Sequence, residues 1–556
     1  MNYTNKKEIF IVAAIMLCAI FLRVLSFMHR GDVWLDELFS VYFINQDSTA
    51  KVLKSLWNED VHAPLYFVFM HLIGKIFGAK IFVYRLFSTI LSTLCVPLAY
   101  IVGKKIFNNK TGYIFSALLA INVFFIYHSI EIRFYGVLVL LSLLSTYFQV
   151  ISLKEQKSYI GLLIANLLVV YTFNLGILFV GLQYLTGILY LYFKKQKISE
   201  YFKSAILTFA LSIPMIIFLL KTIILYNGTL FSFAKDVFYF DLSFLYSLAI
   251  TYFSNLFYNP ANNLTWEYNY LLLFKPITII FGIIPTILAI TGIIKAIKDK
   301  NDRILIILIP SVIFILFETT MALFGKMGIV CRHTIIAFPA IIFVASYGIS
   351  LIKSKPIFVG TLSTILVLQL LTPFVIKGSK LFVNYSFFNN LKADVQSLKL
   401  NNEDYILTPE IGYLYKNLFK EKYQYINLNV DKLCFYNDTK LRTIIFDKEI
   451  NKTNKSEALA PYLKTDKPFI NLRKYLTENY FKNLKNGQKI CVIIQSPEER
   501  FINPSTISEE QYQYSLYQIL INKINLEVIT VLTQQLRLKQ AIKAKDNGYL
   551  IFLFEK

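Results

Sequence analysis

Apolar runs separated by short polar loops dominate the first two thirds of the chain. Each run has close to the roughly 20 residues that a helix needs to cross a hydrocarbon layer of ~30 Å. The runs lie at residues 9–28, 84–102, 112–128, 135–152, 159–174, 175–193, 204–222, 271–293, 304–324, 334–352 and 357–376. The pattern predicts a mainly α-helical, polytopic membrane domain of about 11 spans over residues 1–380.

Residues 381–556 have the pattern of a soluble α/β domain, with short apolar runs between polar segments. A helix is expected over residues 507–523, with Ser508 as its N-cap and Glu509 and Glu510 in its first turn. Because no glycine-rich phosphate loop or metal cluster occurs here, we expect a recognition or packing role for this domain. Strands are expected at Tyr405–Thr408, Thr443–Phe446, Ile490–Gln495, Val528–Leu532 and Tyr549–Phe554.

Composition and charge support a membrane protein rather than a nucleic-acid-binding protein. The 556 residues are 56% hydrophobic and 17% charged, whereas soluble domains are about a quarter charged. The net charge is +22, and much of it lies in short loops between apolar runs, which is a topology signal. No basic recognition helix is present, so no nucleic-acid partner is expected. Cys434 and Cys491 are candidates for a disulfide if the second domain is exported.

Loop charge also predicts the topology. The apolar run from Ile9 to Phe27 is too long for a signal-peptide core, so we interpret it as a retained anchor. The segment 63–78 is short and contains His71 and Lys75. If it lies at the interface without crossing, Lys6, Lys7 and the later Lys/Arg clusters all fall on one side. The prediction is therefore a cytoplasmic N-terminus, with loops 29–83 and 223–270 and the soluble domain outside.

Asp36 and Glu37 open the first external loop, at the start of an apolar-faced helix expected over residues 34–44. A carboxylate at the membrane boundary is suited to act as a general base. The alternative is that both acids simply stabilise the positive end of the helix dipole. Spacing alone leaves both interpretations open.

Further polar clusters lie on the same predicted face. They contain arginines suited to bind phosphate through a bidentate fork. The alternative is that each arginine contacts lipid headgroups or pairs with a nearby acid. Glu318 is a separate acid within an apolar run, and its role is open. The candidates in these clusters are His62, Arg85, Glu131, Arg133, Tyr135 and Arg332.

The order of these clusters resembles GT-C fold glycosyltransferases, specifically the protein O-mannosyltransferase and aminoarabinose-transferase-like group. Asp36-Glu37, directly after the first span, resembles the acidic motif of that group. His62-Ala-Pro64-Leu-Tyr66 resembles its His-Pro-Pro-Leu-Tyr-Tyr motif, with Ala63 in place of one proline. The resemblance is good over residues 1–150 and looser beyond them.

Later segments extend the resemblance. Arg85-Leu-Phe-Ser and Gly103-Lys-Lys-Ile-Phe are similar to the Arg-Leu-Pro-Ser and Gly-Arg-Arg-Leu-Phe ends of one span. Ser129-Ile-Glu131-Ile-Arg133-Phe-Tyr135 is similar to a Ser-x-Glu-x-Arg-x-Tyr turn, and Arg332 to a late arginine before a proline-containing span. Asn174-Leu departs from the His-Tyr of many relatives.

The resemblance implies a hexosyl- or pentosyltransferase of the cell envelope that uses a polyprenyl-phosphate sugar donor. The acceptor would be a lipid, a glycan or a protein, and transfer would invert the anomeric centre. Asp36 would be the catalytic base, assisted by Glu37, and the two acids would form a possible site for Mg²⁺, Mn²⁺ or Ca²⁺. His62, Arg85, Glu131, Arg133, Tyr135 and Arg332 would bind the donor phosphate or substrate.

Two other functions fit a polytopic protein with outward-facing basic clusters. A flippase or transporter of lipid-linked saccharides would be expected to show internal repeats and polar residues along its spans. A polysaccharide ligase would be expected to rely on arginine and histidine in a late external loop rather than on an early Asp-Glu pair. Both remain alternatives at this stage.

Overall fold

The computed structural model describes residues 3–225, 248, 252, 284–324, 331–375, 387–408, 423–427, 467–495, 525–543 and 549–556. It divides into two compact units. The first contains Met1–Gly31 and Leu35–Asn384, and the second contains Asp32–Trp34 and Tyr385–Lys556.

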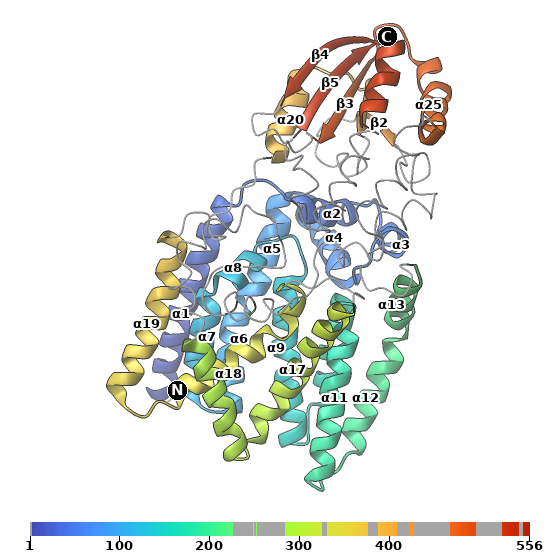
Figure 1. Cartoon of the computed structure of the whole chain (residues 1–556). Helices are drawn as coiled ribbons and strands as arrows, with labels where there is room; N and C mark the ends of the chain where they lie inside the picture. Colours follow the sequence, from blue (N-terminus) through green and yellow to red (C-terminus); the bar gives the residue numbers. More distant parts are fainter. Residues whose placement is uncertain are drawn as a thin grey trace, which may run out of the picture. The chain divides into compact units, whose positions relative to one another are not determined.

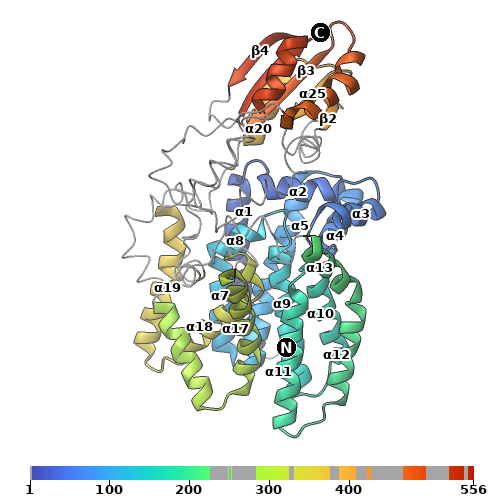
Figure 2. The same cartoon turned by 45° about the vertical axis from the view of Figure 1, so that its right-hand side comes forward.

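The first unit is a bundle of helices (Figures 1 and 2). Residues 284–298 are also helical. The named helices are α1 (Tyr3–His29), α2 (Leu35–Ile44), α3 (Thr49–Glu59), α4 (Leu65–Phe77), α5 (Ile81–Thr93), α6 (Cys95–Ile106), α7 (Asn109–Ile121), α8 (Val123–Ser129), α9 (Tyr135–Lys154), α10 (Tyr159–Thr172), α11 (Gly176–Phe193), α12 (Ser199–Leu211), α13 (Ile213–Leu225), α17 (Asp302–Leu323), the 3₁₀ helix η1 (His333–Ile336), α18 (Phe338–Ser350) and α19 (Lys355–Val375).

Several helices are long and apolar enough to span a membrane, so the chain is a multi-pass membrane protein. In the described residues, five helices meet this criterion, and two bent pairs raise the number to seven. Shorter apolar helices occur at the expected spans 159–174, 334–352 and 357–376. Residues 271–283 of another expected span, and most of loop 223–270, lie outside the described residues.

The bends have local causes in the sequence. Asn122 caps α8 by accepting a hydrogen bond from the N–H of Phe125 at 2.9 Å, and α7 and α8 meet at 62°. Pro214 follows the first residue of α13, where α12 and α13 meet at 52°. Because proline removes a backbone donor and restricts the residue before it, a helix turns easily at such a point.

Polar contacts group the charged loops at one end of the bundle. Glu8 near the start of α1 pairs with Lys104 near the end of α6 at 2.6 Å. Asp302 at the start of α17 pairs with Lys194 at 2.9 Å and Lys154 at 3.4 Å. The start of α1 and the end of the α5–α6 pair therefore lie at the same side of the bundle. The end of α1 and the start of α5 then share the other side, so α4, which lies between them in the sequence, adds no crossing. This arrangement agrees with the interfacial helix expected at residues 63–78.

Two glycines allow α6 and α7 to pack closely. A Cβ atom at Gly103 would lie 2.8 Å from the Cα of Gly112, and a Cβ at Gly112 would lie 2.7 Å from the carbonyl oxygen of Tyr100. A larger residue at either position would force the helices apart. This contact sets the position of the α5–α6 span, which also carries Arg85.

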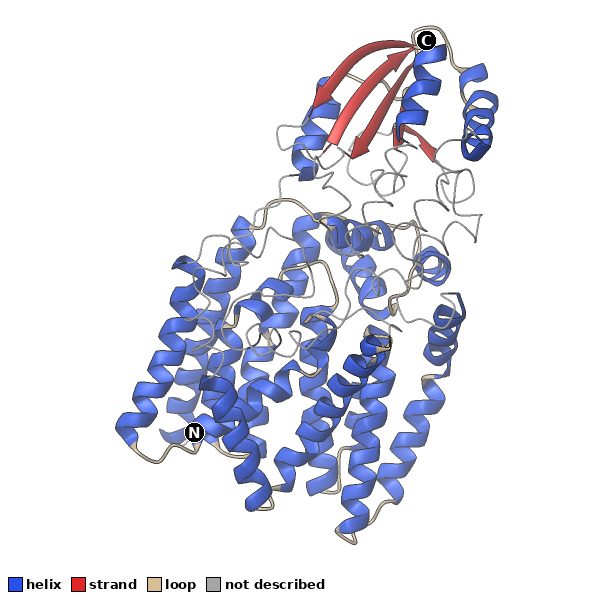
Figure 3. Cartoon of the chain, in the orientation of Figure 1, coloured by secondary structure: helices blue, strands red, loops and turns tan. Residues whose placement is uncertain are grey.

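The second unit contains a five-stranded mixed sheet (Figure 3). The strand order is β2-β1-β3-β5-β4; β1 is parallel to β2 and β3, whereas β5 is antiparallel to β3 and β4. Residues 525–535 are also helical. The named elements are α20 (Phe387–Ser397), β1 (Tyr405–Thr408), β2 (Gln424–Asn427), α25 (Lys467–Asn479), the 3₁₀ helix η3 (Phe481–Asn483), β3 (Lys489–Gln495), β4 (Arg537–Lys543) and β5 (Tyr549–Glu555).

Three of the expected strands match β1, β3 and β5, but the strand expected at Val528–Leu532 is wrong. These residues form a helix, whose buried face contains Val528, Val531 and Leu532 at helical spacing. The short apolar run alone did not distinguish a strand from a buried helix. The expected strand at Thr443–Phe446 and the expected helix at 507–523 lie outside the described residues.

Cys491, one member of the candidate disulfide, is a buried thiol in β3. Cys434 itself lies outside the described residues.

Candidate functional site

Glu37 is a buried carboxylate in the first turn of α2. Arg85 of α5 donates from Nε to Oε1 at 3.1 Å and from Nη2 to Oε2 at 2.7 Å. The backbone N–H of Ile132 also donates to Oε1, at 3.0 Å. Both carboxylate oxygens therefore accept hydrogen bonds within the protein. This bidentate pair connects α2, α5 and the turn before α9.

Glu131 is a second buried carboxylate, in the turn between α8 and α9. Arg30 donates to its Oε1 at 3.0 Å, and His128 Nδ1 lies 2.6 Å from its Oε2. Burial opposes ionisation of Glu131, but His128, Arg30 and Arg332 more than offset it and lower the pKa to about 2. Glu131 is therefore ionised at neutral pH and anchors the turn.

Asp36 differs from these two acids because part of its carboxylate remains accessible. Its side chain is 23% exposed, and that of Arg332 is 24% exposed. Arg332 Nη1 lies 3.3 Å from Asp36 Oδ2. Burial disfavours the charge on Arg332, but Tyr135, Asp36 and Glu131 raise its pKa above the ordinary arginine value. An accessible carboxylate and an accessible guanidinium thus lie side by side.

His62 is held between the carboxylate of Asp60 and the guanidinium of Arg133. Its Nδ1 lies 2.7 Å from Asp60 Oδ1, and Arg133 Nη2 lies 2.9 Å from its Nε2. Since a guanidinium has only donors, Nε2 must accept and the ring proton must be on Nδ1, directed at Asp60. Burial would raise the pKa of Asp60, but His62, the N–H of Val61 and Arg133 lower it overall.

Arg133 links this chain of contacts to α2. Its Nη1 donates to Ser40 Oγ at 3.3 Å and to the carbonyl oxygen of Asp36 at 3.5 Å. The guanidinium therefore contacts both the helix that carries Asp36 and the loop that carries His62. It is buried, with 5% of its surface exposed.

An aromatic layer underlies these polar groups. The Tyr135 ring packs edge to face with His128 at 5.0 Å, and Phe134 lies 5.7 Å from His62. Phe134 in turn stacks on Phe173, at 5.8 Å. The next residue, Asn174, donates through its side-chain amide to the carbonyl oxygen of Val61. The position that departs from the family pattern therefore supports the loop before His62.

The structure brings all eight candidate residues together at the end of the bundle opposite Glu8 and Lys104. Three of them are partly accessible, namely Asp36, His62 and Arg332; the others are buried. Sequence reasoning did not select Arg30, Asp60 and His128 as site residues. Asp60 and His128 lie two and three residues before His62 and Glu131, so their spacing was the available signal.

The two acids suggested for a metal site, Asp36 and Glu37, differ in how accessible they are to a cation. Glu37 already accepts three hydrogen bonds, two of them from the charged Arg85. Within the described part of the chain, no group of three or more His, Cys, Asp or Glu side chains is arranged to hold a metal ion. Asp36 remains the acid with accessible oxygen, and a cation there stays a prediction.

Comparisons with known proteins agree with this fold. Residues 61–220 match the model of the family described as dolichyl-phosphate-mannose-protein mannosyltransferase. No curated protein sequence matches the chain significantly.

Two solved structures of ArnT from Cupriavidus metallidurans are similar over nearly the whole chain. The structure bound to undecaprenyl phosphate has 10% identity and a TM-score of 0.54, covering 98% of this chain and 97% of that chain. The apo structure has 11% identity and a TM-score of 0.55, covering 99% and 98%. At this identity the similarity is one of fold. The chain is thus a multi-pass membrane protein with the GT-C fold of membrane glycosyltransferases.

Proposed function

We propose that the chain transfers a glycosyl group from a polyprenyl-phosphate-linked sugar to an acceptor at the outer face of the cytoplasmic membrane. The family matched by residues 61–220 is described by a dolichyl-phosphate-mannose donor, and one structural relative binds undecaprenyl phosphate. The accessible Asp36 carboxylate beside Arg332 carries the proposal. Asp36 supplies a proton acceptor and Arg332 supplies a phosphate-binding cation within one site.

The proposed reaction needs a base on one side of the anomeric carbon and cationic stabilisation on the other. The acceptor hydroxyl oxygen forms a bond to the anomeric carbon, and its proton passes to Asp36. The bond from the anomeric carbon to the phosphate oxygen breaks, and the polyprenyl phosphate leaves with the electron pair. Attack from the face opposite the phosphate inverts the anomeric centre.

Arg332 is the proposed phosphate ligand because its guanidinium is accessible. The donor phosphate would share or replace its contact with Asp36, which leaves the carboxylate available to the acceptor. Arg133 contacts both His62 and the backbone of Asp36, and we assign Arg133 and His62 to donor binding. Stabilising the leaving phosphate in this way makes a separate general acid unnecessary.

The buried acids have positioning roles in this proposal. Glu37 and Arg85 hold the first turn of α2, where Asp36 contacts Arg332. Glu131 holds the turn that carries Arg133 and Tyr135. We therefore assign Arg85 to the frame of the site rather than to direct phosphate binding, since Glu37 and the carbonyl oxygen of Gly31 already accept its hydrogen bonds.

The proposed sidedness follows from charge. Lysines gather at the end of the bundle that contains the start of α1, and the candidate site lies at the other end. By the positive-inside rule, this distribution supports a cytoplasmic N-terminus and a site on the outer face. A lipid-linked donor can reach a site there, whereas a nucleotide sugar cannot.

The test measures the transfer of label to an acceptor by the purified protein in proteoliposomes. The donors are labelled polyprenyl-phosphate sugars, and the acceptors come from an envelope extract. We expect donor-dependent transfer by the wild type and a loss of at least about a hundredfold in Asp36→Asn, the usual contribution of a general base. Asp47→Asn is the matched control because that acid is 80% exposed and pairs with Lys51. Normal transfer by Asp36→Asn, or label that only crosses the bilayer, would contradict the proposal.

A further inference from the structure

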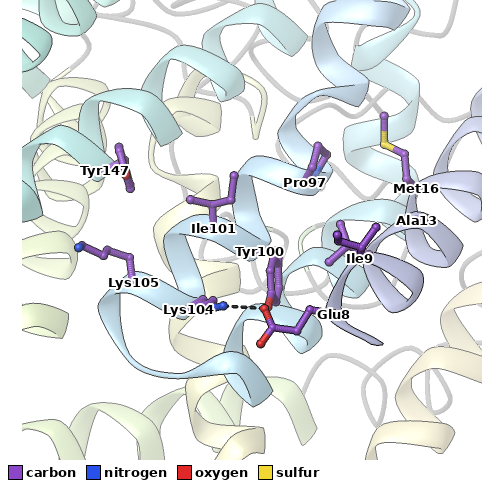
Figure 4. A pocket seen from close by; sticks show the side chains of 11 residues that line it. Glu8, Ile9, Ala13, Met16, Pro97, Tyr100, Ile101, Lys104, Lys105 and Tyr147 are labelled. Atoms are coloured by element: carbon purple, nitrogen blue, oxygen red, sulfur yellow. Dashed lines mark hydrogen bonds and ion pairs between the residues drawn. The ribbon is translucent and has the colours of Figure 1, made fainter. Parts of the chain in front are cut away.

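A groove lies between α1 and α6 at the end of the bundle opposite the candidate site (Figure 4). Its volume is about 630 Å³. One wall is a single face of α1, with lining residues at positions 9, 12, 13 and 16, and the other is a face of α6, at positions 97, 100, 101 and 104. Both sets have the spacing of one helix face, so each wall is a stripe about 10 Å long.

The groove is apolar along most of its length. Ile9 is 52% exposed and Ile101 is 47% exposed. In a membrane protein such exposed apolar side chains contact lipid. Between them, the small side chain of Ala13 leaves the groove open. The apolar lining residues are Ile9, Val12, Ala13, Met16, Pro97 and Ile101.

One end of the groove is polar and basic. Lys104 and Lys105 line it, with side chains 44% and 42% exposed. Lys104 pairs with Glu8 at 2.6 Å, and Tyr100 donates to the same Glu8 oxygen at 2.9 Å (Figure 4). The Glu8 carboxylate thus already occupies a cradle of donors suited to an anion.

Positive charge exceeds negative charge at this end. Two lysines, Lys104 and Lys105, line the groove together with one acid, Glu8. Lys6 and Lys7 directly precede Glu8 in α1 and are exposed. Lys105 also pairs with Glu155, beyond the groove lining. An ammonium group has three donors, so Lys104 can bridge Glu8 and a second anion.

We propose that this groove binds an anionic phospholipid of the surrounding leaflet. One acyl chain lies between the faces of α1 and α6, and the headgroup phosphate lies at Lys104 and Lys105. Basic pockets between membrane helices are suited to such headgroups, since each nearby lysine adds to the attraction. The site is separate from the proposed donor site, because positions 8 and 29 of α1 are roughly 30 Å apart at 1.5 Å per residue.

The polar mouth and the apolar walls together favour a phospholipid over a free anion. Inorganic phosphate would use the lysines but leave the walls of the groove exposed. A neutral lipid would fill the walls but gain nothing from the lysines. A phospholipid gains from both features, because its acyl chain covers the apolar walls and its phosphate meets the lysines.

The experiment measures lipid binding to the purified full chain by native mass spectrometry. The probes are phosphatidylglycerol, phosphatidylcholine and undecaprenyl phosphate, each titrated separately. We expect one phosphatidylglycerol to bind about tenfold more tightly than phosphatidylcholine. The double variant Lys104→Gln/Lys105→Gln should lose this preference. Ala13→Phe should weaken phosphatidylglycerol binding by filling the groove without changing its charge.

Glu8→Gln distinguishes competition with the lipid phosphate from a purely structural role of Glu8. Because Glu8 competes with the lipid phosphate for Lys104, its removal should strengthen phosphatidylglycerol binding several-fold. Lys203→Gln is the matched control, since Lys203 also pairs with an acid, Glu200 at 2.8 Å, but does not line the groove. Lys104→Arg keeps the charge and should still bind phosphatidylglycerol. This variant tests the role of the charge if the glutamine variants do not fold.

Three results would overturn the proposal. They are equal affinity for phosphatidylglycerol and phosphatidylcholine in the wild type, unchanged binding in Ala13→Phe, and a preference for undecaprenyl phosphate that the Lys104 and Lys105 substitutions abolish. The last result would assign the groove to the carrier lipid. None of these measurements requires glycosyl transfer, so the test is independent of the proposed function.

Discussion

Glu37 and Arg85 form a bidentate ion pair that is almost completely buried, with side chains 0% and 5% exposed. The residue before Glu37, Asp36, instead faces Arg332 at the accessible side of the site. Two adjacent acids of one motif therefore have different environments. In the proposed function, this difference assigns a positioning role to Glu37 and the catalytic role to Asp36.

Removing one partner of the buried pair should destabilise the protein. Glu37→Gln leaves the Arg85 charge uncompensated, and such losses are typically about 3–5 kcal/mol. We expect a clear fall in the thermal unfolding midpoint in detergent. The double variant Glu37→Leu/Arg85→Met should recover most of it, because an apolar pair replaces the ions.

The exposed pair of Lys203 and Glu200 is the control for this cycle, and Glu200→Gln should leave the midpoint unchanged. A Glu37→Gln variant as stable as the wild type would show that the pair does not hold α2.

The Asp60–His62–Arg133 chain should determine donor affinity. Asp60→Asn removes the charge that holds the His62 proton on Nδ1, and an amide can instead donate to that nitrogen. The proton would then lie on Nε2, facing Arg133, and the contact would be lost. Loss of a charge-assisted hydrogen bond corresponds to a rise of about tenfold in the KM for the donor.

Steady-state transfer kinetics separate this effect from a loss of the base. Asp60→Asn should raise KM more than it lowers kcat, whereas Asp36→Asn should mainly lower kcat. If Asp60→Asn left the donor KM at the wild-type value, the His62 tautomer would not matter for binding.

Glu131 should make stability depend on pH in the acid range. Its pKa in the folded protein is about 2, below the ordinary value of 4.5. The stability gained from this lowered pKa is present above pH 4.5 and is lost as pH falls from about 4.5 to about 2. The shift corresponds to about 3 kcal/mol.

Unfolding midpoints measured between pH 2 and pH 8 test this prediction. In the wild type, titration of Glu131 should not change the unfolding midpoint between pH 5 and pH 8. The midpoint should fall below pH 4.5. Glu131→Gln should be less stable at neutral pH and should lack part of the acid-induced loss. Parallel curves for the two proteins would contradict the assignment.

Glu318 should be replaceable with a gain in stability. It is fully buried in α17, and neither carboxylate oxygen has a hydrogen-bonding partner among the residues that the structure describes. A buried polar group without a partner costs about 1–3 kcal/mol. Glu318→Leu should therefore raise the unfolding midpoint, and Glu318→Gln should raise it less. A lower midpoint in both variants would show that the carboxylate has a stabilising partner.

The class of the protein and much of its local structure could be predicted from the sequence alone. A run of about 20 apolar residues has few alternatives to a membrane helix, because lipid offers no partner for an open backbone. Lysine-rich loops predicted that residues 63–78 would not cross, and α4 agrees with this. The strands β1, β3 and β5 coincide with short apolar runs. The ordered motifs around Asp36, His62 and Glu131 predicted which segments would form the site.

Only the three-dimensional packing sets the environment of each candidate residue. Asp36 and Glu37 are neighbours with the same chemistry, and only the packing of α2 against α5 buries one of them beside Arg85 while the other remains accessible. Arg85 is buried and Arg332 is partly exposed for the same reason. Likewise, residues 525–535 are helical because they pack with a helical set of buried positions, which a five-residue apolar run does not reveal. Pairings between distant segments depend on three-dimensional contacts, and no local pattern records them.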